Sequence, residues 1–110
     1  MKLLTVPVSI SAMHRLDTDT CLDGDLSEVE IESDDYKELW DSKILEKLNR
    51  ELNILIDDFE DEVIPCDKLT QAFNIVVNYS QKKPHVQVLI KLKKQLEIAI
   101  ENQTGIYFFF

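Results

Sequence analysis

The sequence predicts an α+β protein whose small mixed or antiparallel sheet is covered by three or four helices. Apolar and polar residues alternate with the period of a strand near the N-terminus and near residue 30, and the chain closes on a run of aromatic residues. Between these segments apolar residues recur at helical spacing. With 110 residues, 45% of them apolar, the chain is the right size for one domain over residues 1–110.

The N-terminal third predicts two strands. In residues 3–10 four aliphatic residues alternate with other residues, and Pro7 favours a place at a sheet edge because it cannot donate a ladder hydrogen bond. Residues 11–24 are polar and rich in turn formers. Residues 28–32 carry two aliphatic side chains on one side and three glutamates on the other, which indicates a half-solvated strand or an extended loop.

The longest helical pattern runs from residue 33 to residue 59. Ser33 is an N-cap candidate, and the two aspartates after it are favourable at the positive end of a helix. Apolar residues then follow at helical spacing as far as Phe59. We therefore expect one helix here, or two helices joined near Asp41.

Two further helices follow prolines. Pro65 suits the first turn of a helix, and residues 69–77 present apolar side chains at i, i+3, i+4, i+7 and i+8. After Pro84 another apolar stripe extends to Ile100, and Gly105 offers a C-terminal cap.

The chain finishes with an aromatic strand. Residues 106–110 place large side chains on both sides of the pleat, which predicts a strand between the first and second strands. Helices would cover one face of that sheet. A second copy of the protein could cover the other face, so a homodimer is among the expected assemblies.

Charge is distributed unevenly along the chain. The net charge is −9, with 19 acidic and 6 basic residues before residue 68 and 2 acidic and 6 basic residues from there on. We expect no nucleic-acid partner, because a protein with this much negative charge repels phosphate backbones. A basic protein surface is the natural complement, although acidic surfaces also serve solubility alone.

Nothing in the sequence indicates catalysis, a cofactor or a membrane. No apolar stretch approaches the roughly 20 residues of a membrane span. Cys21 and Cys66 lack a CxxC partner, which suggests reduced thiols in the cytoplasm, and His14 and His85 stand alone. Phosphate-binding glycine loops and the nucleophile and zinc motifs are missing, so we expect a protein that is not an enzyme.

Residues 19–30 are similar to an EF-hand calcium loop. Carboxylates occupy positions 1, 5 and 12, with glycine at position 6 and serine at position 9. Cys21 stands at position 3, where a thiol is a poor ligand for calcium, and the flanks read as strand. The alternative function is therefore a calcium-binding regulatory module, with ligands from Asp19, Asp23, Asp25, Ser27 and Glu30.

A dense acidic cluster is the leading candidate for a binding site. Its residues are Asp57, Asp58, Glu60, Asp61 and Glu62, at the predicted end of a helix. Negative charge at that end opposes the helix dipole, so the cluster lowers the stability of the protein, which indicates that it is kept for a function. We expect it to contact a basic protein partner, together with Asp34, Asp35 and Glu38. The alternatives are a solvated helix end, or neutralisation by the lysines at 82, 83, 91, 93 and 94.

Three features together resemble the small immunity proteins with which bacteria neutralise toxins. They are the acidic stretch at 56–62, the amphipathic helix at 68–79 and the strand-like finish at 104–110, all within the second half of the chain. The resemblance implies a tight protein inhibitor whose acidic surface covers a basic toxin, such as a nuclease.

Overall fold

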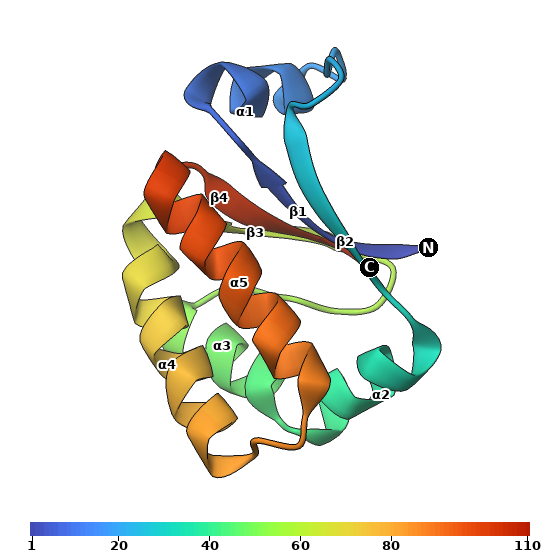
Figure 1. Cartoon of the computed structure of the whole chain (residues 1–110), viewed down its shortest axis with the longest axis vertical. Coiled ribbons are helices and arrows are strands. Elements are labelled where there is room, and N and C mark those ends of the chain that lie inside the picture. The colour runs from blue at the N-terminus through green and yellow to red at the C-terminus, as the bar shows by residue number, and fades with distance from the viewer.

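The computed structural model describes residues 1–110 and contains a four-stranded antiparallel sheet with helices on its two faces (Figure 1). Its strands are β1 (Lys2–Pro7), β2 (Leu26–Ile31), β3 (Asp61–Pro65) and β4 (Gly105–Phe109). Their order across the sheet is β2-β1-β4-β3. The predicted α+β class is confirmed.

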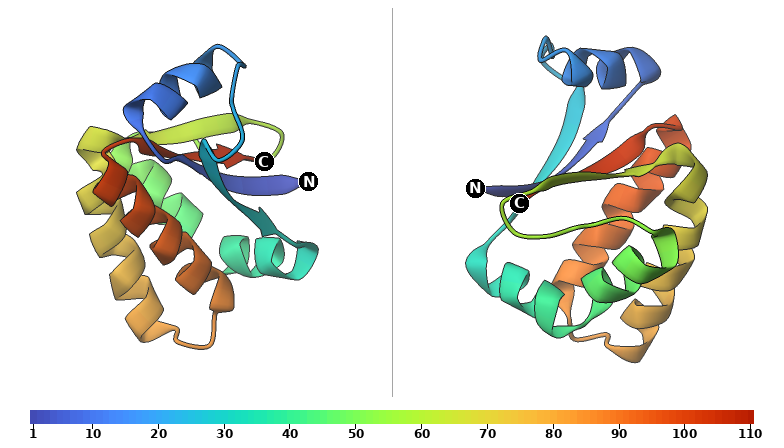
Figure 2. Two further views of the ribbon diagram at one scale, coloured as in Figure 1. Left: turned by 45° about the horizontal axis from the view of Figure 1, so that its top comes forward. Right: turned by 180° about the vertical axis from the view of Figure 1, so that it is seen from behind.

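Four of the five α-helices lie on one face of the sheet. The helices are α1 (Ile10–Asp17), α2 (Ser33–Asp41), α3 (Ile44–Leu52), α4 (Leu69–Lys82) and α5 (Gln87–Asn102), with a 3-10 turn, η1 (Cys66–Lys68), before α4. Helix α5 crosses the strands, α2 and α4 pack against it, and α3 packs against α2 and α4, whereas α1 lies on the opposite side (Figure 2). We call that opposite side the open face. None of the helices combines the length and apolar character that a membrane crossing requires.

The core lies between the sheet and the four helices that cover one of its faces. Leu4 and Val6 of β1 and Ile106 and Phe108 of β4 are all 0% exposed and belong to one cluster of 22 buried apolar residues. Because side chains alternate along a strand, the residues between them face the open side. Tyr107 and Phe109 are therefore only half-buried, and the expectation that both faces of β4 are fully buried is wrong.

The predicted place of the first strand is also wrong. β1 lies between β2 and β4, with Leu4 opposite both Val29 and Phe108. Pro7 is tolerated because it is the last residue of β1, beyond the point where pairing with β4 ends at Thr5. The Pro7 carbonyl there accepts a hydrogen bond from the Thr104 hydroxyl, at 2.7 Å.

Residues 11–24, expected to be a loop, contain most of helix α1. Ser9 caps the helix, since its hydroxyl accepts the Ala12 N–H at 3.0 Å. Ala12 is the only residue of α1 that is fully buried, so the helix has almost no apolar stripe for a periodicity analysis to detect.

The long helical pattern is interrupted twice. The expected break after Asp41 is confirmed, but α3 ends at Leu52 and does not continue to Phe59. The side chain of Asn49 accepts the Ile56 N–H at 2.7 Å and donates to the Ile56 carbonyl at 3.0 Å, which turns the chain back toward the sheet. The segment then forms β3, an edge strand that the sequence analysis did not predict.

The later elements agree with the sequence in type and differ in their ends. The helix predicted over residues 69–77 is part of α4, but Pro65 is the last residue of β3 and precedes η1. Helix α5 ends at Asn102 and is capped by Gln103 in the left-handed conformation (φ 56°), so Gly105 is not its cap. Gly105 instead begins β4, where a Cβ atom would lie 2.9 Å from the Ile64 carbonyl oxygen.

Candidate partner-binding site

The acidic cluster, residues 57–62, lies in the loop after α3 and in the first two residues of β3. It is not at a helix end, because α3 stops at Leu52. Its charges therefore do not oppose a helix dipole, contrary to the expectation from the sequence. We call residues 57–62 the acidic segment.

Asp58 is the one member of the segment that is paired with a cation. It accepts hydrogen bonds from the Tyr36 hydroxyl and from Lys2 Nζ, the latter at 3.3 Å. The bond from Tyr36 is the main cause of the lowered pKa of Asp58, and Lys2 lowers it further. Burial, followed by the hydrogen bond to Asp58, raises the pKa of Tyr36 to about 12.

Glu62 and Asp57 bind the backbone of the segment itself. The two Glu62 oxygens accept the Leu55 N–H at 2.9 Å and the Val63 N–H at 2.8 Å, which joins the loop to β3. Asp57 accepts the N–H of the next residue at 2.7 Å. Glu60 and Asp61 form no ion pair or side-chain hydrogen bond, so their charges are left to the solvent.

The alternative interpretation, neutralisation of the segment by lysines 82, 83, 91, 93 and 94, is wrong. Lys91 binds Asp35 of α2 at 2.6 Å, and Lys83 donates to the Ser42 carbonyl at 3.2 Å. Lysines 82, 93 and 94 form no ion pair. Lys2 of β1, which the sequence analysis did not consider, is the only cation that pairs with the segment.

Phe59 projects from the middle of the acidic segment. Its side chain is 90% exposed and its backbone is left-handed, with φ 63°. Bulky residues rarely adopt that conformation, and a large exposed aromatic side chain gains nothing from folding. Lys2 Nζ lies over its ring, 5.5 Å from the ring centroid. The loop therefore presents an apolar group to the solvent with carboxylates on both sides.

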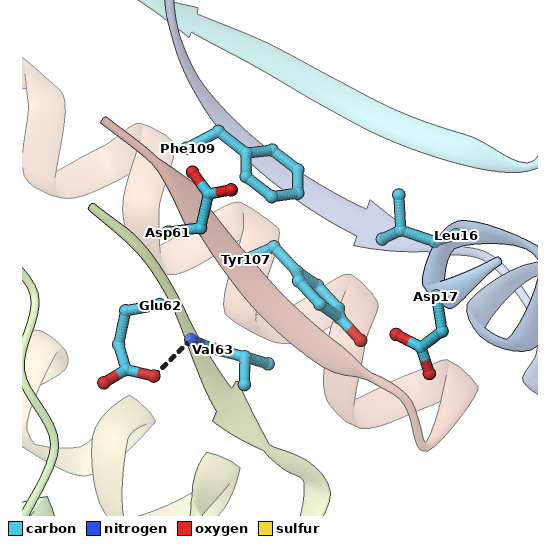
Figure 3. Close-up of a pocket in the computed structure, with 7 residues that line it drawn as sticks. All are labelled: Leu16, Asp17, Asp61, Glu62, Val63, Tyr107 and Phe109. Carbon is cyan, nitrogen blue, oxygen red and sulfur yellow. Dashed lines mark hydrogen bonds between the residues drawn. The ribbon is translucent and has the colours of Figure 1, made fainter. Parts of the chain in front are cut away.

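A groove of about 270 Å³ lies beside the segment on the open face, between α1 and β3 (Figure 3). Its lining residues are Leu16 and Asp17 of α1, Asp61, Glu62 and Val63 of β3, and Tyr107 and Phe109 of β4. The rings of Tyr107 and Phe109 lie 5.8 Å apart at 32° and form its floor. The alternation of β4 turns them to this side, because Ile106 and Phe108 point into the core.

The groove has a negative rim. Asp17 lies beside the Tyr107 hydroxyl, and Asp61 lies beside the Phe109 ring (Figure 3). Burial and then the charge of Asp17 raise the pKa of Tyr107 above its ordinary value, at which the phenol is already protonated at neutral pH. With carboxylates, a neutral phenol and apolar walls, the groove can bind a cation that has an apolar stem.

The open face extends the negative charge across the sheet. Glu28 and Glu30 of β2 lie opposite Thr5 and Leu3 of β1, which places their side chains on this face. Neither glutamate takes part in an ion pair. Positive charge instead gathers around a hollow between α3 and α4, lined by Lys43, Lys47, Arg50, Lys82 and Lys83.

The three acidic residues of α2 do not form one surface with the segment. Tyr36 brings the first turn of α2 beside Asp58. Asp35, however, is neutralised by Lys91, and Glu38 lines a separate hollow with Lys83. Asp34 is exposed and pairs with no cation.

The calcium-loop residues are not brought together. The Asp25 carboxylate is held by Arg15, Ser27 donates to Gln95 at 3.1 Å, and Glu30 lies on β2. Asp19 and Asp23 are exposed on the connection between α1 and β2. No group of three or more His, Cys, Asp or Glu side chains is arranged to hold a metal ion.

Sequence reasoning found Asp61 and Glu62 and missed the other five residues of the groove. Leu16, Asp17, Val63, Tyr107 and Phe109 come from three elements that are far apart in the chain. The one available signal was the alternation at the C-terminus, which puts the last two of these on one face. Comparison with known proteins places the chain in no group, since no family model, curated protein or solved structure matches it.

Proposed function

We propose that this protein is a non-catalytic module that binds a basic protein partner through the acidic segment and the neighbouring groove. The observation that carries the proposal is that these carboxylates, apart from Asp58, are not neutralised by the protein's own cations. They flank an exposed Phe59 and an apolar groove. Charge raises the rate of association and apolar contacts hold a complex together, so both components of an interface are present.

The separation of charge supports one orientation of approach. Carboxylates occupy the open face and its loop, and lysines and an arginine line the hollow between α3 and α4. A basic partner is attracted by the first surface and repelled by the second, which aligns the encounter before contact.

The immunity-type inhibitor is the specific form of this proposal, with a basic toxin as the partner. It rests on the resemblance of the acidic stretch, the following helix and the final strand. A cytoplasmic location agrees with it, because Cys21 and Cys66 are exposed thiols that form no disulfide.

The test compares two double variants that change the net charge equally. Asp57→Asn with Glu60→Gln neutralises the acidic segment, and Asp67→Asn with Glu97→Gln neutralises two exposed carboxylates elsewhere that have no ion pair. The partner is captured from lysate of the source cells with the wild-type protein, identified by mass spectrometry, purified, and its Kd measured from low to high salt.

We expect the segment variant to bind at least about tenfold more weakly, a loss of about 1.4 kcal/mol, with a flatter dependence on salt. The control variant should keep the wild-type affinity to within about twofold, because its charges lie away from the interface. Equal losses in the two variants would show that net charge alone drives the binding, and the proposal would then fail.

A further inference from the structure

We propose that the groove between α1 and β3 receives an arginine side chain of the partner. The inference rests on the proposed function and assigns one residue of the partner to one site. The groove is defined by the Tyr107 and Phe109 rings as its floor, Leu16 and Val63 as apolar walls, and Asp17 and Asp61 at its rim (Figure 3).

The size of the groove favours a side chain over a larger ligand. Its volume of about 270 Å³ lies below the roughly 300–1,000 Å³ of sites for small molecules and cofactors. It is still many times the roughly 10–15 Å³ of cavity volume that one water molecule needs, so a long side chain can enter. The groove is open to solvent, so a side chain of another protein can enter it.

The chemistry of the lining favours a cation with an apolar stem. Two aromatic rings offer their faces to a cation and apolar surface to its methylene groups. The Asp17 and Asp61 carboxylates come from different elements and neither is in an ion pair. A purely apolar side chain would displace water from these carboxylates and offer no hydrogen bond in its place, which costs free energy. An anionic side chain would be repelled by them.

Arginine suits this arrangement better than lysine. The guanidinium is planar, stacks on aromatic faces and carries five N–H donors in a fixed fork, so it can contact a ring and a carboxylate together. It is also more weakly hydrated than an ammonium group, which lowers the cost of entering a half-buried site.

The protein's own cations do not fill the groove. Arg15, on the helix that forms one wall, is held by both oxygens of Asp25. Lys2 of the neighbouring strand binds Asp58 and the carbonyl of Phe110. Glu62 also lines the groove, but both of its oxygens accept backbone N–H groups, which leaves Asp17 and Asp61 for the ligand.

The test is an NMR titration of the full-length, ¹⁵N-labelled protein with two acetylated and amidated tripeptides. One is Gly-Arg-Gly, and the other is Gly-citrulline-Gly, whose side chain has nearly the same shape and no charge. We expect the arginine peptide to shift the amide signals of Leu16, Val63 and Phe109 at millimolar concentration in low salt. Its Kd should be at least fivefold lower than that of the citrulline peptide.

Two variants fix the site. Asp17→Asn with Asp61→Asn removes the rim charges and should raise the Kd of the arginine peptide at least fivefold. Because both residues are exposed, the spectrum of this variant should remain that of the folded protein. The Asp67→Asn, Glu97→Gln variant should leave the Kd unchanged. Equal binding of the two peptides, equal effects of the two variants, or no shift at the groove would overturn the proposal.

The peptide titration and the partner-binding test can fail independently, because the two tests alter different residues. If the tripeptide ignores the groove while Asp57→Asn with Glu60→Gln still weakens capture of the partner, the arginine site is wrong and the binding function stands. If the tripeptide binds the groove while the segment variant captures the partner normally, the role of the acidic segment is wrong.

Discussion

The guanidinium of Arg15 donates two hydrogen bonds to the carboxylate of Asp25, Nε to one oxygen and Nη2 to the other, each at 2.7 Å. Asp25 also accepts the Leu22 N–H at 2.8 Å. The pair joins helix α1 to the turn before β2, and Asp25 is only 6% exposed. Because Asp25 is bound only when it is ionised, the stability that this pair contributes depends on pH.

The first prediction concerns acid stability. The Arg15 hydrogen bonds, with that from Leu22, lower the pKa of Asp25 to about 2, against about 3.9 in an unfolded chain. Because the folded pKa is the lower, the stabilisation by ionised Asp25 is complete above about pH 4 and is lost as the pH falls toward 2. We expect Asp25→Asn to lower the urea midpoint at pH 7 and to flatten the decline of stability between pH 4 and pH 2.

The control is Asp23→Asn, two residues away, since Asp23 is exposed and forms no ion pair. It should leave both the midpoint and the acid-side decline as in the wild type. Urea unfolding followed by circular dichroism at pH 7, 4, 3 and 2 makes the comparison. Parallel pH profiles for Asp25→Asn and the wild type would contradict the assignment.

The second prediction compares two buried threonines. Thr5 is 0% exposed and its hydroxyl has no hydrogen-bond partner, whereas Thr104 is 1% exposed and donates to the Pro7 carbonyl. Valine has nearly the same shape without the hydroxyl. We expect Thr5→Val to raise the free energy of unfolding by about 1 kcal/mol and Thr104→Val to lower it by about 1 kcal/mol. Urea denaturation of both variants checks the signs, and a loss of stability in Thr5→Val would be the contrary result.

The third prediction is that calcium does not bind at residues 19–30. Asp25 is occupied by Arg15, and Glu30 lies on β2 away from the turn. Millimolar calcium chloride should therefore give no saturable heat in isothermal titration and no shift of the thermal midpoint. Saturable heat that disappears in Glu30→Gln would restore the calcium-module interpretation.

Periodicity located most of the fold correctly. β1, β2, α4 and α5 each carry a regular pattern of apolar residues that the core buries, and that pattern is a property of the sequence alone. β3 was missed because its five residues include two carboxylates and a proline, while helical spacing continued past Leu52 by coincidence. The Asn49 contacts with Ile56 that end the helical path are tertiary, so no local rule could have supplied them.

Strand order limited how much of the site could be predicted. The acidic segment was visible as composition, but the groove exists only because β4 lies between β1 and β3. The role of Gln95 also could not be predicted without the tertiary structure. Gln95 is a polar residue of α5 that is 1% exposed, and it joins the helix to the Leu4 and Ser27 carbonyls across the sheet. The sequence presents it only as one polar position on an amphipathic helix.

Helix α1 buries a single residue, Ala12, and is anchored mainly by the Arg15 pair. Elements with so few buried contacts exchange their amide hydrogens through local opening, at a free-energy cost well below that of global unfolding. One wall of the groove can therefore give way while the floor, which continues into the core through Phe108, keeps its shape. A ligand wider than the resting groove would therefore displace α1, a helix of eight residues, more easily than β3 on the other side.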